Sequence, residues 1–264
     1  MQITSRDNSL LRQVRAVRDG KIEELIFIEG LRLCEEAYRS QLAIEAVIVS
    51  EELLRKERAA AVIGELSGVS KRVGSVSEKL LESVSYTKTP QGIIVLAQRP
   101  AASEERLAAS LDNSPLLVVL HRINNPVNVG AIVRTAEAAG ATGVITTKNT
   151  SDPFSPKALR GAMGSAFRLP VWSGIEFEEM IQWCRGRGIV TVCADVEAST
   201  SYTELDWTGP TALVLGPESS GFTDDELESA DRKVSIPMKG DAESLNVSVA
   251  AGILLFEAAR QRVS

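Results

Sequence analysis

Short apolar runs alternate with amphipathic segments along the first hundred residues. The apolar runs lie at 25–28, 44–49, 71–74 and 92–97, and segments with helical spacing lie at 8–18, 31–40, 51–65 and 77–84. Strand-like runs that alternate with helices are typical of an α/β fold. Residues 1–99 are therefore predicted to form a small α/β domain.

The alternation continues after residue 115 with more strongly apolar runs. These runs lie at 116–120, 143–147, 169–172, 189–194, 212–216 and 234–236, and helical segments lie at 129–139, 156–166, 176–186 and 224–230. Continuous apolar runs are typical of parallel strands that are buried on both faces. Residues 115–264 are predicted to form a second α/β domain around a parallel sheet, and the polar, Ala- and Ser-rich residues 100–114 are predicted to link the two domains.

The closing helix differs from the others because no charged residue lies between Ser244 and Phe256. A helix that is apolar on all sides is buried on all sides, and this one is shorter than the ~20 residues that a membrane span needs. We expect it inside a core or a subunit interface. Its start, at Ser244–Asn246, follows a polar loop, and free backbone N–H groups at a helix start readily bind ligands.

The composition limits where the protein works and which metals it could hold. Of 264 residues 44% are hydrophobic, no apolar run reaches spanning length, and the first residues carry no apolar leader segment. The three cysteines are scattered and there is one histidine, which excludes a zinc site built from cysteines or histidines alone. We expect a cytoplasmic protein that needs no membrane and no metal.

The net charge of −6 argues against a simple nucleic-acid binder, because such proteins are usually basic. The charge is unevenly distributed, however, since residues 1–21 hold five Lys or Arg and two acidic residues. Arg12, Arg15 and Arg18 recur at every third position and would form a basic ridge on a helix. This ridge is either an ordinary solvated helix face or a contact surface for RNA phosphates.

Several common enzyme motifs are missing from the sequence. No G-x-G-x-x-G follows a predicted strand and no Walker A sequence occurs, so neither a Rossmann nucleotide loop nor a P-loop is indicated. The G-x-S-x-G of acyl-transferring α/β enzymes is missing as well. An ordinary sugar- or acyl-transferring α/β enzyme is therefore disfavoured.

Three segments of the second half, in order, resemble the motifs of one family. They are NPVNVGAIVRTA at 125–136, LVLGPESSG at 213–221, and IPM at 236–238 followed by SLNVSVA at 244–250. Together they resemble the three motifs of the SpoU (TrmH-like) RNA 2′-O-ribose methyltransferases of the SPOUT class. The resemblance covers residues 116–262 well, and it covers the first hundred residues more loosely, through FIEG at 27–30 and PQGI at 90–93.

The resemblance implies a fold and an activity. Members of the family have a parallel-sheet domain whose C-terminal segment threads through a loop as a trefoil knot, and they dimerise through that region. They use S-adenosylmethionine as methyl donor. Because the first half resembles the RNA substrate-binding domain of ribosomal-RNA members, the resemblance implies a homodimer that methylates large-subunit (23S) ribosomal RNA. A transfer-RNA substrate and a catalytically silent RNA-binding protein of the same fold are the alternatives.

By the same resemblance, Arg134 activates the ribose hydroxyl. A guanidinium keeps its proton up to about pH 12, so we favour an electrostatic clamp on the developing alkoxide over a general base. The apolar stripe of the predicted helix, formed by Ile132, Ala136 and Ala139, leaves Arg134 on the opposite side.

The resemblance also places Asn128, Glu218, Ser244 and Asn246 around the arginine and the ribose. Asn128 stands at the expected start of its helix, as Ser244 and Asn246 do for the closing helix, so helix capping is the alternative for all three. Glu218 follows a predicted buried strand, and α/β sites form at the carboxyl ends of parallel strands. An ordinary solvated loop glutamate is the alternative for Glu218.

The expected donor site consists mainly of backbone groups. Gly216, Ile236 and Leu245 match family positions that hold the adenosine part of the donor, and Met238 lies beside them. The only histidine, His121, follows a predicted strand. An imidazole has a pKa suited to general-base work, but the resemblance assigns His121 no catalytic role.

Overall fold

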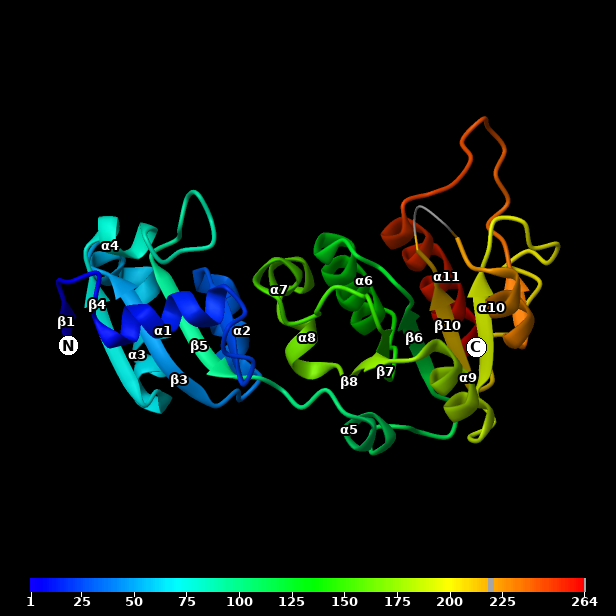
Figure 1. Ribbon diagram of the computed structural model, residues 1–264, viewed down its shortest axis with the longest axis horizontal. Helices are drawn as coiled ribbons and strands as arrows, with labels where there is room; N and C mark the ends of the chain where they lie inside the picture. The colour runs from blue at the N-terminus through cyan, green and yellow to red at the C-terminus, as the bar shows by residue number, and fades with distance from the viewer. Residues whose placement is uncertain (218–220, 264) are drawn as a thin grey trace. The chain divides into compact units, whose positions relative to one another are not determined.

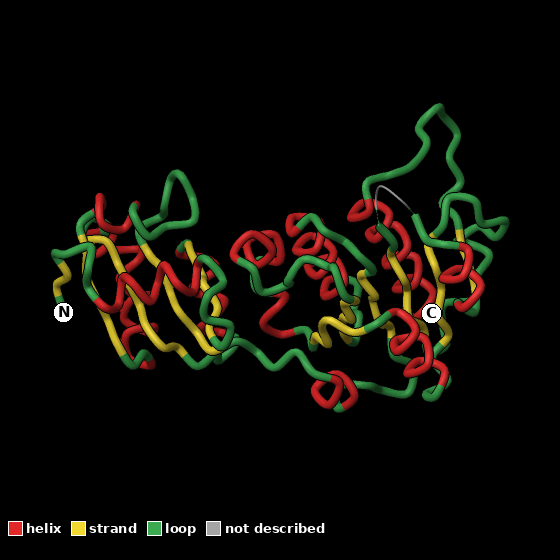
Figure 2. Tube along the Cα trace, viewed as in Figure 1, coloured by secondary structure: helices red, strands yellow, loops and turns green. Residues whose placement is uncertain are grey.

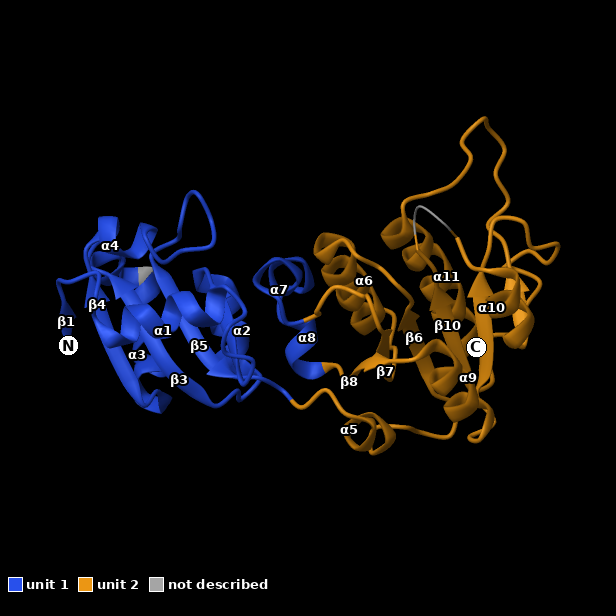
Figure 3. Ribbon diagram, viewed as in Figure 1, with its two compact units in different colours: residues 1–100, 154–168 blue, residues 101–153, 169–264 orange. Residues whose placement is uncertain are grey.

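The computed structural model describes residues 1–217 and 221–263, and the chain forms two compact units (Figure 1, Figure 3). Unit 1 comprises Met1–Pro100 and Phe154–Arg168, and unit 2 comprises Ala101–Pro153 and Leu169–Ser264. Unit 1 therefore includes a segment that is far along the chain from the rest of it. In both units strands alternate with helices along the sequence (Figure 2).

Unit 1 contains a mixed sheet with the strand order β1-β4-β3-β5-β2. Its strands are β1 (Gln2–Ile3), β2 (Leu25–Glu29), β3 (Ile44–Ser50), β4 (Arg72–Val76) and β5 (Ile93–Gln98). Its helices are α1 (Ser9–Arg18), α2 (Leu31–Arg39), the 3-10 helix η1 (Leu53–Arg55), α3 (Glu57–Val69), α4 (Glu78–Glu82), α7 (Pro156–Ala162) and α8 (Ser165–Arg168). The strands β1, β4 and β3 are parallel, and β5 runs antiparallel to both of its neighbours.

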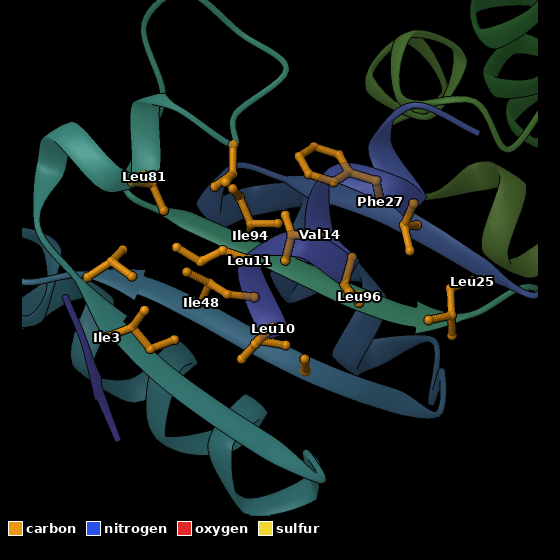
Figure 4. Packing of buried hydrophobic residues seen from close by; sticks show 14 residues of the cluster. Ile3, Leu10, Leu11, Val14, Leu25, Phe27, Ile48, Leu81, Ile94 and Leu96 are labelled. Atoms are coloured by element: carbon orange, nitrogen blue, oxygen red, sulfur yellow. The ribbon is translucent and has the colours of Figure 1, made fainter. Parts of the chain in front are cut away.

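Helix α1 is part of the core of unit 1 (Figure 4). The side chain of Asn8 caps the helix by accepting a hydrogen bond from the backbone N–H of Leu10 at 2.9 Å. Leu10, Leu11 and Val14 are fully or almost fully buried in one cluster with sheet residues such as Ile48. Because these apolar positions have helical spacing, α1 buries one face and leaves the other to solvent.

Unit 2 contains a parallel sheet with the strand order β11-β9-β10-β6-β7-β8. Its strands are β6 (Leu116–Leu120), β7 (Gly143–Thr147), β8 (Val171–Ile175), β9 (Val190–Ala194), β10 (Thr211–Leu215) and β11 (Arg232–Val234). Its helices are α5 (Glu104–Ala108), α6 (Pro126–Ala138), α9 (Phe177–Arg185), α10 (Asp224–Ser229) and α11 (Val247–Arg262). All of the strand pairings are parallel, as the apolar runs predicted.

The core of unit 2 includes part of the predicted linker. Side chains of β6 and β10, such as Leu117 and Val214, pack in one cluster with Met180 and Ile181 of α9. Leu107 of α5 is completely buried in the same cluster. The segment 100–114 thus carries a short helix that is anchored in the core of unit 2.

Helix α11 is buried on one side within the chain. Val247, Leu254 and Leu255 are buried, whereas the side chains of Val249 and Phe256 are 50% and 53% exposed. Of the two locations expected for this apolar helix, complete burial within the core of one chain is therefore wrong. In the described part of the chain, no helix has both the length and the apolar character to cross a bilayer.

Candidate functional site

A cavity of about 440 Å³ lies in unit 2 where three parallel strands end. Lining residues come from the end of β9 and the turn after it (194–196), from the end of β10 and the turn after it (215–217), and from Val234 and Ile236 at the end of β11. The registers of these strands place Ala194 beside both Leu215 and Val234. Ligand sites of parallel α/β sheets form at the carboxyl ends of the strands, so the position of the cavity is that of a binding site.

Further lining residues come from the start of α11 and the loop before it. Six residues predicted for the site line the cavity together: Gly216, Ile236, Met238, Ser244, Leu245 and Asn246. The loop between β11 and α11 extends away from the sheet (Figure 1). Because the strand ends and the start of α11 enclose one space, residues that are far apart in the sequence share one cavity.

Two asparagines connect the start of α11 to α6. Asn246 caps α11, since its Oδ1 accepts hydrogen bonds from the backbone N–H and the hydroxyl of Ser248 at 2.9 and 2.6 Å. Its Nδ2 donates to Oδ1 of the buried Asn128 at 3.4 Å. The capping alternative is thus confirmed for Asn246. It is wrong for Asn128, because Asn125 caps α6 and accepts from the N–H of Val127 at 3.0 Å.

Arg134 lies on the solvent side of α6 and does not line the cavity. Ile132 and Ala136 of the same helix are completely buried and Ala139 is also buried, as the predicted stripe requires. Arg134 forms no hydrogen bond or ion pair with the described part of the chain. Its guanidinium is therefore available to a ligand. Glu218, the remaining predicted site residue, lies outside the described residues.

The aromatic ring of Phe222 packs against the end of β10 and also lines the cavity. A Cβ atom placed on Gly216 would lie 2.6 Å from Cε2 of Phe222, so the ring is packed directly on the glycine. The Phe222 ring also stacks on the ring of His121, with a centroid distance of 5.9 Å and an interplanar angle of 5°. A side chain at this position would therefore collide with Phe222 unless the ring shifted.

His121 is buried and supports this wall without lining the cavity. Its Nδ1 lies 3.0 Å from the hydroxyl of Thr147, and its Nε2 lies 3.0 Å from Oε1 of Glu226. Burial lowers the pKa of His121, and the positive charge of Arg122 lowers it further, against the opposing effect of Glu226. A neutral imidazole that donates from Nε2 to Glu226 and accepts at Nδ1 satisfies these contacts.

Glu226 joins the histidine to the helix that follows Phe222. Its side chain accepts from the backbone N–H of Thr223 at 2.8 Å and so completes the capping box of α10. The same carboxylate accepts a hydrogen bond from Nη2 of Arg122 at 2.8 Å. Burial acts to raise the pKa of Glu226, but the N–H of Thr223 and the contacts with His121 and Arg122 outweigh it, so this pKa is lowered. The carboxylate therefore fixes the start of α10 close to the cavity wall.

The size and lining of the cavity suit a small organic ligand. Its volume falls within the roughly 300–1,000 Å³ of small-molecule sites, and its wall combines apolar side chains with backbone groups at the strand ends. Within the described residues, no group of three or more His, Cys, Asp or Glu is placed to hold a metal ion. The Cys193 thiol is buried, and its pKa is raised to about 12, mainly by desolvation.

Asp195 and Phe222 are among the cavity-lining residues that the sequence did not predict. Asp195 directly follows the predicted strand 189–194, so the rule that places sites at the carboxyl ends of strands could have identified it. Phe222 carries no comparable signal, because its contact with Gly216 depends on how the chain returns after β10.

Comparison with known proteins finds two family matches. Residues 115–256 match the SpoU rRNA Methylase family, and residues 10–95 match the MRM3-like substrate binding domain. Among curated proteins, a 23S rRNA (guanosine-2'-O-)-methyltransferase RlmB of Ralstonia nicotianae is 36% identical over 200 residues, which cover 75% of this chain and 80% of that protein.

Solved structures separate into those that match the whole chain and those that match part of it. The AdoMet-bound rRNA methyltransferase of Sinorhizobium meliloti has a TM-score of 0.86 and 29% identity, and covers 98% of this chain and 97% of its own. The TrmH/SpoU tRNA modifying enzyme of A. aeolicus has a TM-score of 0.51 and 34% identity, and covers 60% of this chain and 82% of its own.

Proposed function

Because the chain belongs to the SpoU rRNA methylase family, we propose that it transfers a methyl group from S-adenosylmethionine to a ribose 2′-hydroxyl of 23S ribosomal RNA. The observation that carries this proposal is the single cavity lined by Gly216, Ile236, Leu245 and Asn246 at the ends of the parallel strands. A solved relative with AdoMet bound matches almost the whole chain. The trefoil knot that the family implies remains a prediction for this chain.

The cavity residues are assigned to binding and orientation of the donor. S-adenosylmethionine supplies a methyl group on a positively charged sulfur, so the donor is already activated and needs mainly to be positioned. Backbone groups near Gly216, Ile236 and Leu245 hold the adenosine part, and Met238 packs beside it. The Asn128–Asn246 hydrogen bond fixes the start of α11 relative to α6 and therefore relative to Arg134.

Arg134 is assigned to the acceptor hydroxyl. Its guanidinium stabilises the negative charge that develops on the ribose oxygen during attack, and it can contact an adjacent phosphate through its second pair of N–H groups. The hydroxyl proton leaves to phosphate or water, because a guanidinium at neutral pH cannot accept it. Ser244 and Glu218 are assigned to the surroundings of the ribose and the arginine by the family resemblance.

The substrate class follows from the first domain. Two relatives named for ribosomal RNA cover 98% and 75% of this chain. A relative named as a tRNA modifying enzyme covers 60% of it. The match of residues 10–95 to a substrate binding domain supports an RNA-holding role for this half. Ribosomal RNA is therefore favoured over transfer RNA, with the cytoplasm as the place of action.

A homodimer is proposed from the exposed side of α11. Val249 and Phe256 are about half exposed on the part of α11, residues 247–256, that carries no charge, and an exposed apolar patch favours association. A second copy of the chain would cover these side chains through a symmetric contact.

The test is transfer of labelled methyl groups to unmodified RNA. The purified protein, supplied with S-adenosylmethionine, should label 23S ribosomal RNA, and the label should remain on ribose after digestion to nucleosides. Bulk transfer RNA serves as the matched alternative substrate. Labelling of transfer RNA alone would favour the tRNA alternative. Donor binding without labelling of either RNA would favour a silent RNA-binding protein.

A further inference from the structure

The described wall of the cavity contains one ionisable side chain, that of Asp195. The other described lining residues carry apolar side chains, no side chain, or uncharged polar groups such as those of Ser244 and Asn246. Glu218 lies outside the described residues and is not included. A ligand in this cavity is thus exposed to one negative charge from the described wall.

The turn after β9 holds the carboxylate of Asp195 in place. The backbone N–H of Asp195 donates to the carbonyl of Val234 at 3.0 Å, which joins this residue to β11. Its Oδ1 accepts from the N–H of Glu197 at 3.4 Å, and its carbonyl accepts from the N–H of Ala198 at 3.3 Å. No Lys, Arg or His in the described part of the chain forms an ion pair with Asp195. Its negative charge is therefore held in position but is not neutralised there.

The donor and its product differ in the charge that such a carboxylate can detect. S-adenosylmethionine and S-adenosylhomocysteine share the adenosine, the ammonium and the carboxylate. They differ by one methyl group and by the positive charge on sulfur. A fixed carboxylate attracts the sulfonium and has no such attraction for the neutral thioether, and the attraction is stronger beside an apolar wall than in bulk water.

We propose that Asp195 makes the cavity selective for the charged donor over the neutral product. The proposal rests on the proposed function, because it requires the cavity to be the donor site. Once the methyl group has left, the sulfur is neutral and the attraction to Asp195 is lost. Asp195 is thus a specificity residue that strengthens binding of the donor relative to the product, so the product competes less well for the cavity.

The test measures the affinity of three ligands by calorimetry. S-adenosylmethionine and sinefungin, in which an ammonium-bearing carbon replaces the sulfonium, are positively charged at this position, and S-adenosylhomocysteine is neutral. Asp195→Asn removes the charge and keeps the shape. It should weaken both charged ligands by about tenfold, the size of a single partly screened charge pair, and should leave the neutral ligand within about twofold.

Two further variants identify the cause of the change. Glu197→Gln removes an exposed negative charge two residues away that does not line the cavity, and should alter none of the three affinities. Asp195→Glu keeps the charge and should retain most of the preference for charged ligands. Added salt should reduce this preference in the native protein, since the carboxylate is only half-buried.

Three outcomes would overturn the proposal. An equal loss of all three affinities in Asp195→Asn would assign Asp195 to a group that the ligands share, such as the ribose hydroxyls. Unchanged affinities would leave it without a role in selection. If the native protein bound none of the three ligands, the donor-site assignment itself would fail. That result is distinguishable, because the first two outcomes require normal binding by the native protein.

Discussion

Replacement of Gly216 by alanine tests how the cavity wall is built. The added Cβ would lie 2.6 and 2.7 Å from Cε2 and Cζ of Phe222, closer than carbon atoms approach without a shift. The backbone of Gly216 is not in the left-handed region, so alanine is tolerated by the backbone and only the contact is strained. The Phe222 ring is stacked on His121, and His121 is bonded to Thr147 and Glu226.

The size of the effect follows from this contact. The volume of one methyl group is small against a cavity of about 440 Å³, so lost space is the minor effect. Overpacking of a dense site costs typically about 1–3 kcal/mol. Since both Gly216 and Phe222 line the cavity, a shift of either one distorts the site for the donor. If the bound state carries the whole cost, Gly216→Ala should weaken S-adenosylmethionine binding by about 5- to 150-fold.

Calorimetry on a double-mutant cycle measures this directly. Phe222→Leu removes the ring atoms that the new Cβ would meet, so adding it to Gly216→Ala should restore part of the lost affinity. Such a positive interaction is expected only for residues in contact. Thermal unfolding of each variant separates a change in binding from a change in stability. Normal donor binding by Gly216→Ala, or equal losses in the single and double variants, would refute the argument.

Three other predictions concern pH, RNA and assembly. The pKa of His121 in the folded state lies below its ordinary value of 6.5, so the unfolded chain binds more protons. The free energy of unfolding should therefore decrease as the pH is lowered below about 6.5, and this group contributes at most about 1.4 kcal/mol per pH unit. His121→Gln should make the thermal unfolding temperature less dependent on pH between about 7.5 and about 5.5. Arg12→Ala should reduce the salt slope of RNA binding by about 0.9, and an unchanged slope would make the ridge an ordinary solvated surface. Phe256→Asp should convert a dimer into a monomer of 28.4 kDa in light scattering, and a native protein that is already monomeric would contradict the proposed interface.

Local contacts engage part of the basic ridge of α1. Arg12 is exposed, but Arg15 donates to the carbonyl of Arg6 at 2.8 Å, and Arg18 pairs with Asp19 at 2.8 Å. Local bonds therefore engage two members of the ridge. Deletion of residues 1–21 would also remove core side chains such as Leu10, so a point substitution is the sounder test of RNA contact.

Periodicity predicted most of the fold because burial and hydrogen bonding act locally. The apolar runs became strands and the helical spacings became helices, with the parallel sheet of unit 2 as expected. The sequence could not indicate that residues 154–168 belong to unit 1, since contacts between distant segments leave no periodic pattern. The same applies to helix ends, where Asn125 and not Asn128 provides the cap of α6.

The candidate site was predicted in its residues more fully than in its geometry. Family motifs identified Gly216, Ile236 and Asn246, and these residues share one cavity. The motifs did not indicate that Phe222 fills the space above Gly216, or that His121 supports that ring from outside the cavity. Such contacts are set by packing in three dimensions, which explains why they emerge only from the structure.

In the proposed mechanism, Arg134 acts on the attacking ribose oxygen while a separate cavity holds the donor. Single-turnover methyl transfer to 23S ribosomal RNA fragments by Arg134→Ala, with donor affinity measured in parallel, tests it most directly. The rate should fall by about 10²–10³, because the charge that Arg134 meets exists only in the transition state, and donor affinity should stay at the native value. Arg134→Lys should recover little, since a point charge cannot replace a planar fork. Near-native transfer by the alanine variant, or a loss of rate that merely follows a loss of donor binding, would contradict the account.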